Sequence, residues 1–126
     1  MTVKKGGSGR LRKIESELQR VLAELIAREV KDPRVGNVTI TGVSLAADMG
    51  VAKVFYAPFV SSHPREEVQS GLNRAAGFLR GEAGRRLALR HAPRLDFVFD
   101  DTAEKAARLT GLIDRAVADD SSKADE

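Results

Sequence analysis

The sequence predicts an α+β domain in which helices cover one face of a three-stranded sheet. Apolar residues recur three and four positions apart over Arg10–Val30 and Leu72–Arg90, as in amphipathic helices. Three shorter stretches, Val38–Leu45, Val51–Val60 and Leu95–Phe99, are rich in β-branched or aromatic residues and indicate strands. The resulting order, helix, strand, strand, helix, break, helix, strand, helix, is typical of this class.

Length and composition narrow the class of protein. A chain of 126 residues is expected to form one domain that buries roughly two-thirds of its unfolded surface. The absence of cysteine excludes disulfides and thiolate metal sites and suits an intracellular, reducing setting. We expect neither a signal peptide nor a membrane span, because the basic N-terminus is followed by no apolar run and apolar runs elsewhere are short.

Charge is unevenly distributed along the chain. The whole carries 21 basic and 18 acidic residues, whereas the tail Asp119–Glu126 holds four acids and one lysine, so the remainder has a net charge of +6. We expect this acidic tail and a basic arm, residues 1–9, to be disordered, which leaves residues 10–118 as the folded domain. A basic domain suits a polyanionic partner such as nucleic acid, although many ordinary cytosolic domains share this balance.

The first helix, Arg10–Val30, is expected to end near Lys31, because Asp32 precedes a proline and is disfavoured in helical geometry. Within it, Glu24 and Arg28 are spaced for an ion pair one turn apart. This segment therefore predicts a long helix with one apolar side.

The first predicted strand, Val38–Leu45, changes the phase of its alternation halfway, which a β-bulge at Gly42 would reconcile. A short turn around Asp48 then joins it to the second strand as a hairpin. In that second strand, Phe55 and Lys53 point to the same side. This pair fits either a base-stacking platform or, more commonly, partly buried packing.

The next helical region begins after the start signal Ser61–Pro64, which offers a small polar cap and a proline near the first turn. Its part Leu72–Arg90 combines an apolar stripe with five arginines. Four glycines interrupt or adjoin it, each costing about 1 kcal/mol relative to alanine in a helix interior. We expect a break at Ala75-Ala76-Gly77, because it leaves Phe78–Arg90 as a second helix of useful length.

The end of the domain carries one more strand and one more helix. Pro93 is expected to end the preceding helix, and Leu95–Phe99 alternates as a strand. Asp101 and Glu104 then resemble a capping box, which predicts a last helix through Ala116.

No arrangement of residues indicates catalysis or a cofactor. His63 and His91 are not spaced as a metal-binding pair, and Asp100 and Asp101 are adjacent, so they point to opposite sides of a strand. The sequence contains neither a phosphate-binding loop of the Walker type nor a nucleophile paired with a base by spacing. We therefore expect no enzyme activity, no metal and no small-molecule substrate.

Five blocks of the sequence, in their order and spacing, resemble the ribosome-binding factor A family over Arg10 to about Ala118. They are Arg28–Gly36, Val38–Val43, Asp48 with Ala52–Val54, Leu72–Arg80 and Pro93–Asp101. Two positions depart from the family pattern: Ala46 stands where serine is usual, and Gly81 creates an additional GxxG.

The resemblance implies a KH-like (type II) αββααβ domain with a C-terminal helix, in which an Ala-x-Gly kink, here Ala75-Ala76-Gly77, replaces the KH GxxG loop. It also implies a cytoplasmic, monomeric, non-enzymatic factor. Such a factor binds the free 30S subunit, assists late maturation and 5′-end processing of 16S rRNA, and supports growth at low temperature.

The alternative is a general KH module that binds single-stranded RNA through the GxxG motif at Gly81–Gly84. We interpret that motif as helix interior or a local bend, because a break there would leave under two helical turns before Pro93.

Basic residues on this frame would supply phosphate contacts, and each could equally be an ordinary solvated charge. We expect replacement of Arg74, Arg80 and Arg85 by alanine to leave thermal unfolding nearly unchanged and to weaken 30S association. The full set of RNA-binding candidates is Arg74, Arg80, Arg85, Arg86, Arg90, Arg34, Lys53, Arg10, Arg12 and Lys13.

Overall fold

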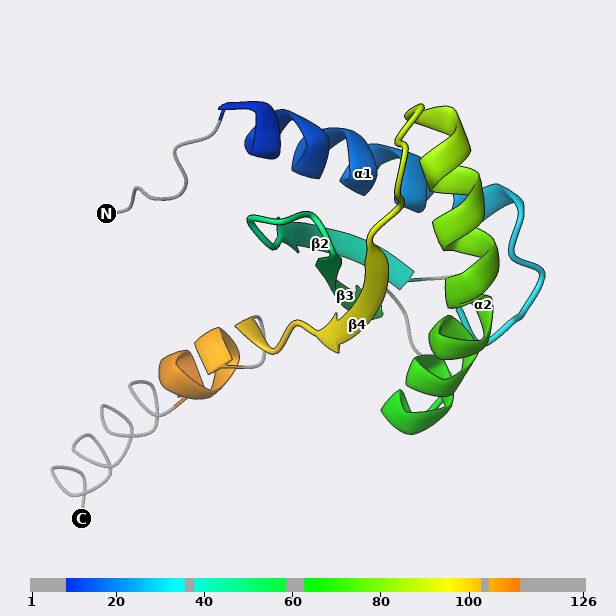
Figure 1. Ribbon diagram of the computed structural model, residues 1–126. Helices are drawn as coiled ribbons and strands as arrows, with labels where there is room; N and C mark the ends of the chain where they lie inside the picture. Colours follow the sequence, from blue (N-terminus) through cyan, green and yellow to red (C-terminus); the bar gives the residue numbers. More distant parts are fainter. Residues whose placement is uncertain (1–8, 36–37, 59–62, 103–104, 112–126) are drawn as a thin grey trace, which may run out of the picture.

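The computed structural model describes residues 9–35, 38–58, 63–102 and 105–111 (Figure 1). Its elements are helix α1 (Gly9–Arg28), strands β2 (Val38–Leu45) and β3 (Val51–Pro58), helix α2 (Arg65–Arg86) and strand β4 (Arg94–Phe99). Thr102 and residues 105–111 are also helical. The basic arm up to residue 8, the acidic tail and the rest of the predicted last helix lie outside the described residues.

The three strands form one mixed sheet in the order β2-β3-β4. β2 and β3 pair antiparallel as the predicted hairpin, and β3 and β4 pair parallel, with α2 as the crossover. The register of the hairpin shifts between Ile40 and Gly42, so Thr41 is the extra residue of a bulge. The predicted bulge is thereby confirmed, and both halves of β2 can turn apolar side chains toward the helices.

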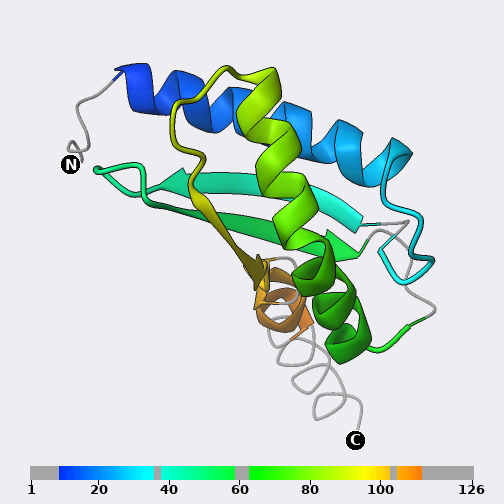
Figure 2. The same cartoon turned by 45° about the vertical axis from the view of Figure 1, so that its right-hand side comes forward.

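Both helices lie on the same face of the sheet (Figure 2). Their apolar stripes meet the inward side chains of the strands in one core, where each fully buried aliphatic or aromatic side chain contributes roughly 1.5–3 kcal/mol. The predicted α+β class, with helices on one face, is confirmed. The core includes Leu18, Leu22 and Leu25 from α1, Val54, Tyr56 and Phe97 from the sheet, and Val68, Leu72 and Leu79 from α2.

The break expected at Ala75-Ala76-Gly77 is wrong, because all three residues lie inside α2, which is one continuous helix of 22 residues. Leu72 and Leu79, seven positions apart, are both fully buried. Seven residues span about two helical turns, so one unbroken helix buries both while keeping its backbone hydrogen bonds. The Gly81–Gly84 segment is also helical, as interpreted from the sequence.

Helix α2 ends at Arg86, four residues before the end expected from Arg90. The amide N–H of Leu89 donates to the carbonyl oxygen of Gly84 at 2.9 Å, and that of Ala88 donates to Arg85 at 3.2 Å. This pair of bonds is the Schellman motif, which requires a left-handed residue just beyond the helix. Ala88 takes that position with a φ of 54°.

The structure corrects one of the two start signals predicted for helices after residue 60. Pro64 is the N-cap residue of α2 and makes no side-chain capping bond, so the expected small polar cap is not found there. At the start of the last helix, the carboxylate of Asp100 accepts the N–H of Thr102 at 2.9 Å, and the backbone carbonyl oxygen of Asp101 accepts the N–H of Lys105 at 2.8 Å. The partner expected for Asp101 in a capping box, Glu104, lies outside the described residues.

Candidate nucleic-acid interface

Helix α2 is fixed to the sheet by a polar network beneath its first half. The hydroxyl of the fully buried Tyr56 donates to Oε1 of Gln69, and Nε2 of Gln69 donates to the carbonyl oxygen of Phe97 at 3.0 Å. Burial raises the pKa of Tyr56, so its hydroxyl keeps its proton at neutral pH. The network gives α2 a defined orientation, and its outward side chains therefore occupy fixed positions.

Two of the candidate arginines support local backbone structure. Arg34 binds both carboxylate oxygens of Asp32, with the closest contact at 2.6 Å, and is only 22% exposed. These bonds lower the pKa of Asp32 to about 2. Arg80 donates from Nε and Nη2 to the carbonyl oxygen of Ala92, at 3.0 and 2.9 Å. Arg80 therefore holds the loop after α2, and its replacement by alanine is no longer expected to leave unfolding unchanged.

Two further candidates form ion pairs near the end of α2. Arg85 pairs with Glu82 of the same helix, which raises the pKa of Arg85, yet the arginine side chain remains 72% exposed. Arg86 pairs with Glu24 of α1 at 3.5 Å. The ion pair that Glu24 forms thus joins the two helices, whereas the sequence had suggested Arg28 of α1 as its partner.

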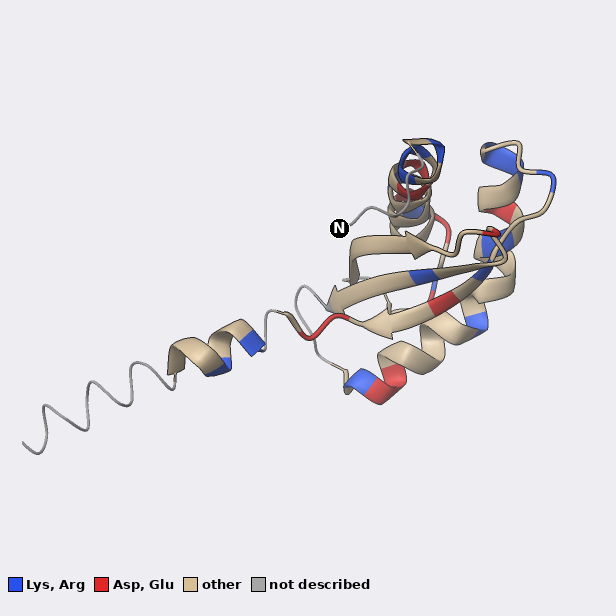
Figure 3. Ribbon diagram, turned by 60° about the vertical axis from the view of Figure 1, so that its left-hand side comes forward, with Lys and Arg blue, Asp and Glu red and all other residues tan. Residues whose placement is uncertain are grey.

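The remaining six candidates are exposed and form no ion pair within the described parts of the chain. They do not form one cluster, and Figure 3 shows basic residues along both helices and beyond the end of α2. Arg10, Arg12 and Lys13 lie at the start of α1, whose 20 residues extend over roughly 30 Å. Lys53 lies on the uncovered face of the sheet, in register with Asp96, while Arg74 is on α2 and Arg90 follows it.

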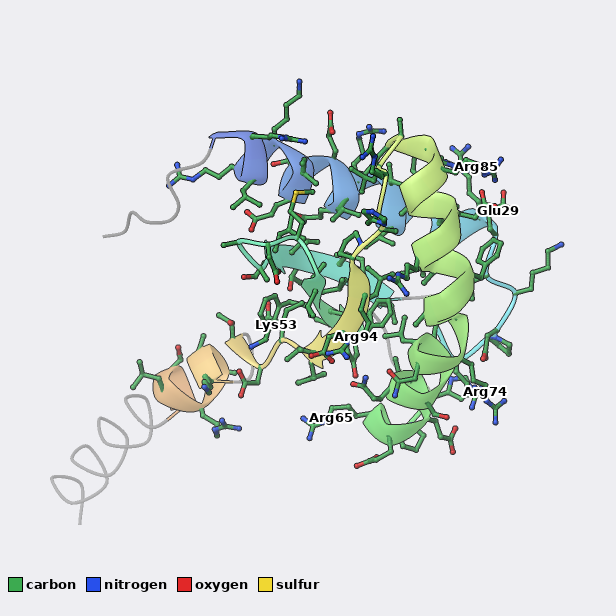
Figure 4. The ribbon with its side chains drawn as sticks, viewed as in Figure 1. Glu29, Lys53, Arg65, Arg74, Arg85 and Arg94 are labelled. Carbon is green, nitrogen blue, oxygen red and sulfur yellow. The ribbon has the colours of Figure 1, made fainter. Side chains whose placement is uncertain are left out.

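In the second half of α2, one side faces away from the core and is exposed. We call this side the outer face, and it comprises Arg74, Gly77, Phe78, Gly81 and Arg85. Figure 4 shows Arg74 and Arg85 projecting from α2 away from the sheet, on the side opposite to Lys53 and Arg94. Phe78 is 47% exposed and lies between the two arginines in the helix.

The four glycines of α2 fall into two classes. A Cβ on Gly71 would lie 3.0 Å from Cγ1 of Val35, and one on Gly84 would lie 2.9 Å from Cβ of Ala92. These two glycines therefore allow close packing of α2 on neighbouring loops. Gly77 and Gly81, on the outer face, would meet nothing within 4 Å. Packing within the described chain does not account for them.

The candidate list from the sequence omitted Phe78. A helical wheel could have identified it, because successive residues turn by about 100° and Phe78 therefore lies off the stripe of Leu79. Phe55, the aromatic considered as a stacking platform, is half-buried on the uncovered sheet face. Phe99 packs edge-on against Tyr56 and under the guanidinium of Arg65, 4.5 Å from its ring centre, so it is engaged internally.

Other kinds of site find little support in the structure. Two open hollows flank Phe99, and the acidic residues Glu66, Asp100 and Asp101 contribute to their walls, which disfavours an anionic ligand there. Within the described ranges, no cluster of His, Cys, Asp or Glu is arranged to hold a metal ion. No helix in those ranges combines the length and the hydropathy needed to cross a bilayer.

Comparison with known protein families finds one family that matches nearly the whole described chain. A family model described as ribosome-binding factor A matches residues 10–113. Ribosome-binding factor A of Thioalkalivibrio sulfidiphilus is 51% identical over 111 residues, which cover 88% of this chain and 86% of the relative. The similarity thus spans the whole described fold.

Solved structures similar to this chain belong to the same family. The crystal structure of ribosome-binding factor A from Thermus thermophilus matches with a TM-score of 0.62 at 32% identity, covering 70% of this chain and 93% of that one. A homology model of the Thermus thermophilus factor, fitted into the cryo-EM map of its complex with the 30S subunit, matches with a TM-score of 0.59 at 32% identity, covering 70% and 92%.

Proposed function

The chain belongs to the ribosome-binding factor A family, and on that premise we propose that it is an assembly factor for the small ribosomal subunit. It binds the free 30S subunit through 16S rRNA and assists late maturation of that RNA, including processing of its 5′ end. It acts in the cytoplasm as a monomer, by binding rather than by catalysis, and its action matters most for growth at low temperature.

The observation that carries the proposal is the similarity to a factor fitted into the map of a 30S complex. The charge of this chain supports it independently, because exposed arginines that form no ion pair with a described residue, such as Arg74 and Arg90, are available for phosphates. They stand on or next to a helix whose orientation is fixed by the core. Recognition would then depend largely on the shape of the folded RNA, with phosphate contacts setting the register.

The alternative, a KH module that clamps RNA with a GxxG loop, loses its main support. Gly81 and Gly84 lie inside α2, and Gly84 faces Ala92 rather than solvent. The loop geometry that such a clamp needs is therefore missing at this position, and the arginines remain the candidates for RNA contacts.

Sedimentation of the purified protein with ribosomal particles tests the proposal. We expect co-sedimentation with free 30S subunits, weakening as salt is raised, and little with assembled 70S ribosomes. Tight, sequence-dependent binding to short naked oligonucleotides, without preference for the 30S subunit, would instead support the general RNA-binding module.

A further inference from the structure

We propose that Phe78 is a stacking platform for an unpaired base of the ribosomal RNA, with Arg74 and Arg85 binding the phosphates on either side. This inference rests on the proposed function and specifies the surface and the part of the RNA that meet. The evidence lies in the exposure of Phe78, the two flanking arginines and the bare helix backbone around it.

Phe78 is exposed where a helix of this kind would ordinarily place a polar residue. It is 47% exposed, and in the described part of the chain Leu109 is the only other large hydrophobic side chain that is exposed. Leu79, the next residue, already supplies the buried position of this turn. Phe78 is therefore not needed to complete the core, and its ring is available to a partner.

The arginines on either side give this aromatic side chain a cationic setting. Arg74 lies four residues before Phe78 and Arg85 seven residues after it, which corresponds to about 6 Å and 10 Å along the helix axis. Glu82 holds Arg85 by an ion pair, but the arginine is 72% exposed and retains further N–H donors for a phosphate. Arg74 forms no ion pair with any described residue.

The glycines on either side of Phe78 allow a partner to approach closely. Gly77 precedes it and Gly81 follows one turn later, and a Cβ on either would meet nothing within 4 Å. Both glycines weaken the helix relative to alanine, without a packing contact that explains them. A ribose-phosphate chain carrying a stacked base could therefore lie against the backbone of α2.

The charge on this face favours RNA over a protein partner. The outer face holds two arginines and no acid. Of the acids beside it, Glu82 is paired with Arg85 and Asp32 with Arg34, while Glu67 lies about two turns before Arg74. An aromatic ring stacks on any base because every base has a π-face, and flanking cations attract the phosphates that join the bases. A hydrophobic protein contact would need no such cations.

A tryptophan introduced at position 78 provides a direct test of base stacking. The chain contains no other tryptophan, so all tryptophan fluorescence would come from this site. In the full-length Phe78→Trp variant, addition of free 30S subunits should quench the tryptophan fluorescence as a base stacks on the indole. The matched control is Leu109→Trp, which places the probe at the other exposed hydrophobic position, 61% exposed. Equal or absent quenching at both positions would overturn the proposal.

A substitution series separates stacking from hydrophobic contact. Phe78→Ala and Phe78→Leu should each weaken 30S binding by about 5- to 100-fold, while Phe78→Tyr and Phe78→Trp retain it. Unfolding by urea should change little in all four variants, since the ring is outside the core. If Phe78→Leu binds as tightly as the wild type, while Phe78→Ala does not, the partner is a hydrophobic protein surface and the proposal is wrong.

The same series distinguishes this inference from the function on which it rests. Failure of the wild-type protein to bind 30S subunits would overturn both. Normal binding by the wild type and by every Phe78 variant would overturn the stacking platform alone.

Discussion

A Cβ added to Gly84 would lie 2.9 Å from the Cβ of Ala92, so α2 and the loop leading to β4 pack too closely at this point for any larger residue. Substitution of Gly84 by alanine should therefore push the loop away and lower the free energy of unfolding by about 1–3 kcal/mol. Urea denaturation followed by circular dichroism measures this change. An unaltered midpoint would show that the loop is not packed against the helix.

The exposed glycines provide the opposite prediction. Gly77→Ala and Gly81→Ala should each raise the free energy of unfolding by up to about 1 kcal/mol, because alanine is the better helix former and meets nothing within 4 Å. If the outer face binds RNA at close range, the same two variants should bind 30S subunits more weakly. A variant that is both more stable and a tighter binder would contradict the close approach.

Elements that depend on local sequence patterns were predicted correctly, whereas the course of α2 at Gly77 was not. The bounds of β2, the bulge near Gly42 and the helical nature of the Gly81–Gly84 segment followed from local patterns and helix length. The break at Gly77 did not occur, because the tertiary packing of Leu72 and Leu79 on the same side outweighs the low helix propensity of one glycine.

The candidate site was less predictable than the fold. Charge composition identified the arginines, but the partner of each one depends on contacts distant in sequence, as for Arg80 with Ala92 and Arg86 with Glu24. The exposure of Phe78 also depends on which side of α2 meets the sheet. The periodicity of apolar residues suggests which side of α2 meets the sheet, and the structure establishes it.

The end of α2 contains a correctable strain. Ala88 adopts a left-handed φ of 54° at the position where Schellman motifs favour glycine. Ala88→Gly should raise the free energy of unfolding by about 0.5–1 kcal/mol, whereas Leu87→Gly, at an ordinary φ of −93°, should lower it. Thermal unfolding of the two variants checks the sign, and destabilisation by both would rule out the left-handed assignment at Ala88.

Arg34 and Arg74 should respond in opposite ways to replacement by alanine. Arg34→Ala removes the guanidinium that binds Asp32 and should destabilise the fold, while Arg74→Ala should change unfolding by less than about 0.5 kcal/mol. In binding, Arg74→Ala should weaken 30S association and reduce the salt slope by about one. Urea titrations of both variants measure the structural role expected for Arg34, and salt titrations of 30S binding measure the RNA-binding role expected for Arg74. A loss of stability in Arg74→Ala but not in Arg34→Ala would contradict this assignment.

Asp32 and Asp100 should make the stability depend on acid pH. The pKa of Asp100 is lowered to about 2 by hydrogen bonds from Thr102 and from Oγ1 of Thr41, the latter at 2.6 Å, and the pKa of Asp32 is also about 2. Because both carboxyls have lower pKa values in the folded chain, their contribution is complete above about pH 4 and is lost as pH falls toward 2.

Titration of the aspartate carboxyls by NMR tests the contribution of the Thr41 hydrogen bond to the pKa of Asp100. The Thr41→Val variant should move the pKa of Asp100 upward toward its ordinary value of 3.8. Thr39→Val, at an exposed position of the same strand, should leave it unchanged. A pKa near 3.8 for Asp100 in the wild-type protein would show that the bond to Thr41 is not formed in solution.

The binding of free 30S subunits by variants of matched charge tests the central claim, that the outer face of α2 contacts the ribosomal RNA. Arg74→Ala and Arg20→Ala each remove one exposed helical arginine, the first from α2 and the second from α1. In quantitative co-sedimentation at fixed salt, Arg74→Ala combined with Phe78→Ala should bind at least tenfold more weakly than Arg20→Ala combined with Leu109→Ala. Equal affinities of the two double variants would contradict the claim.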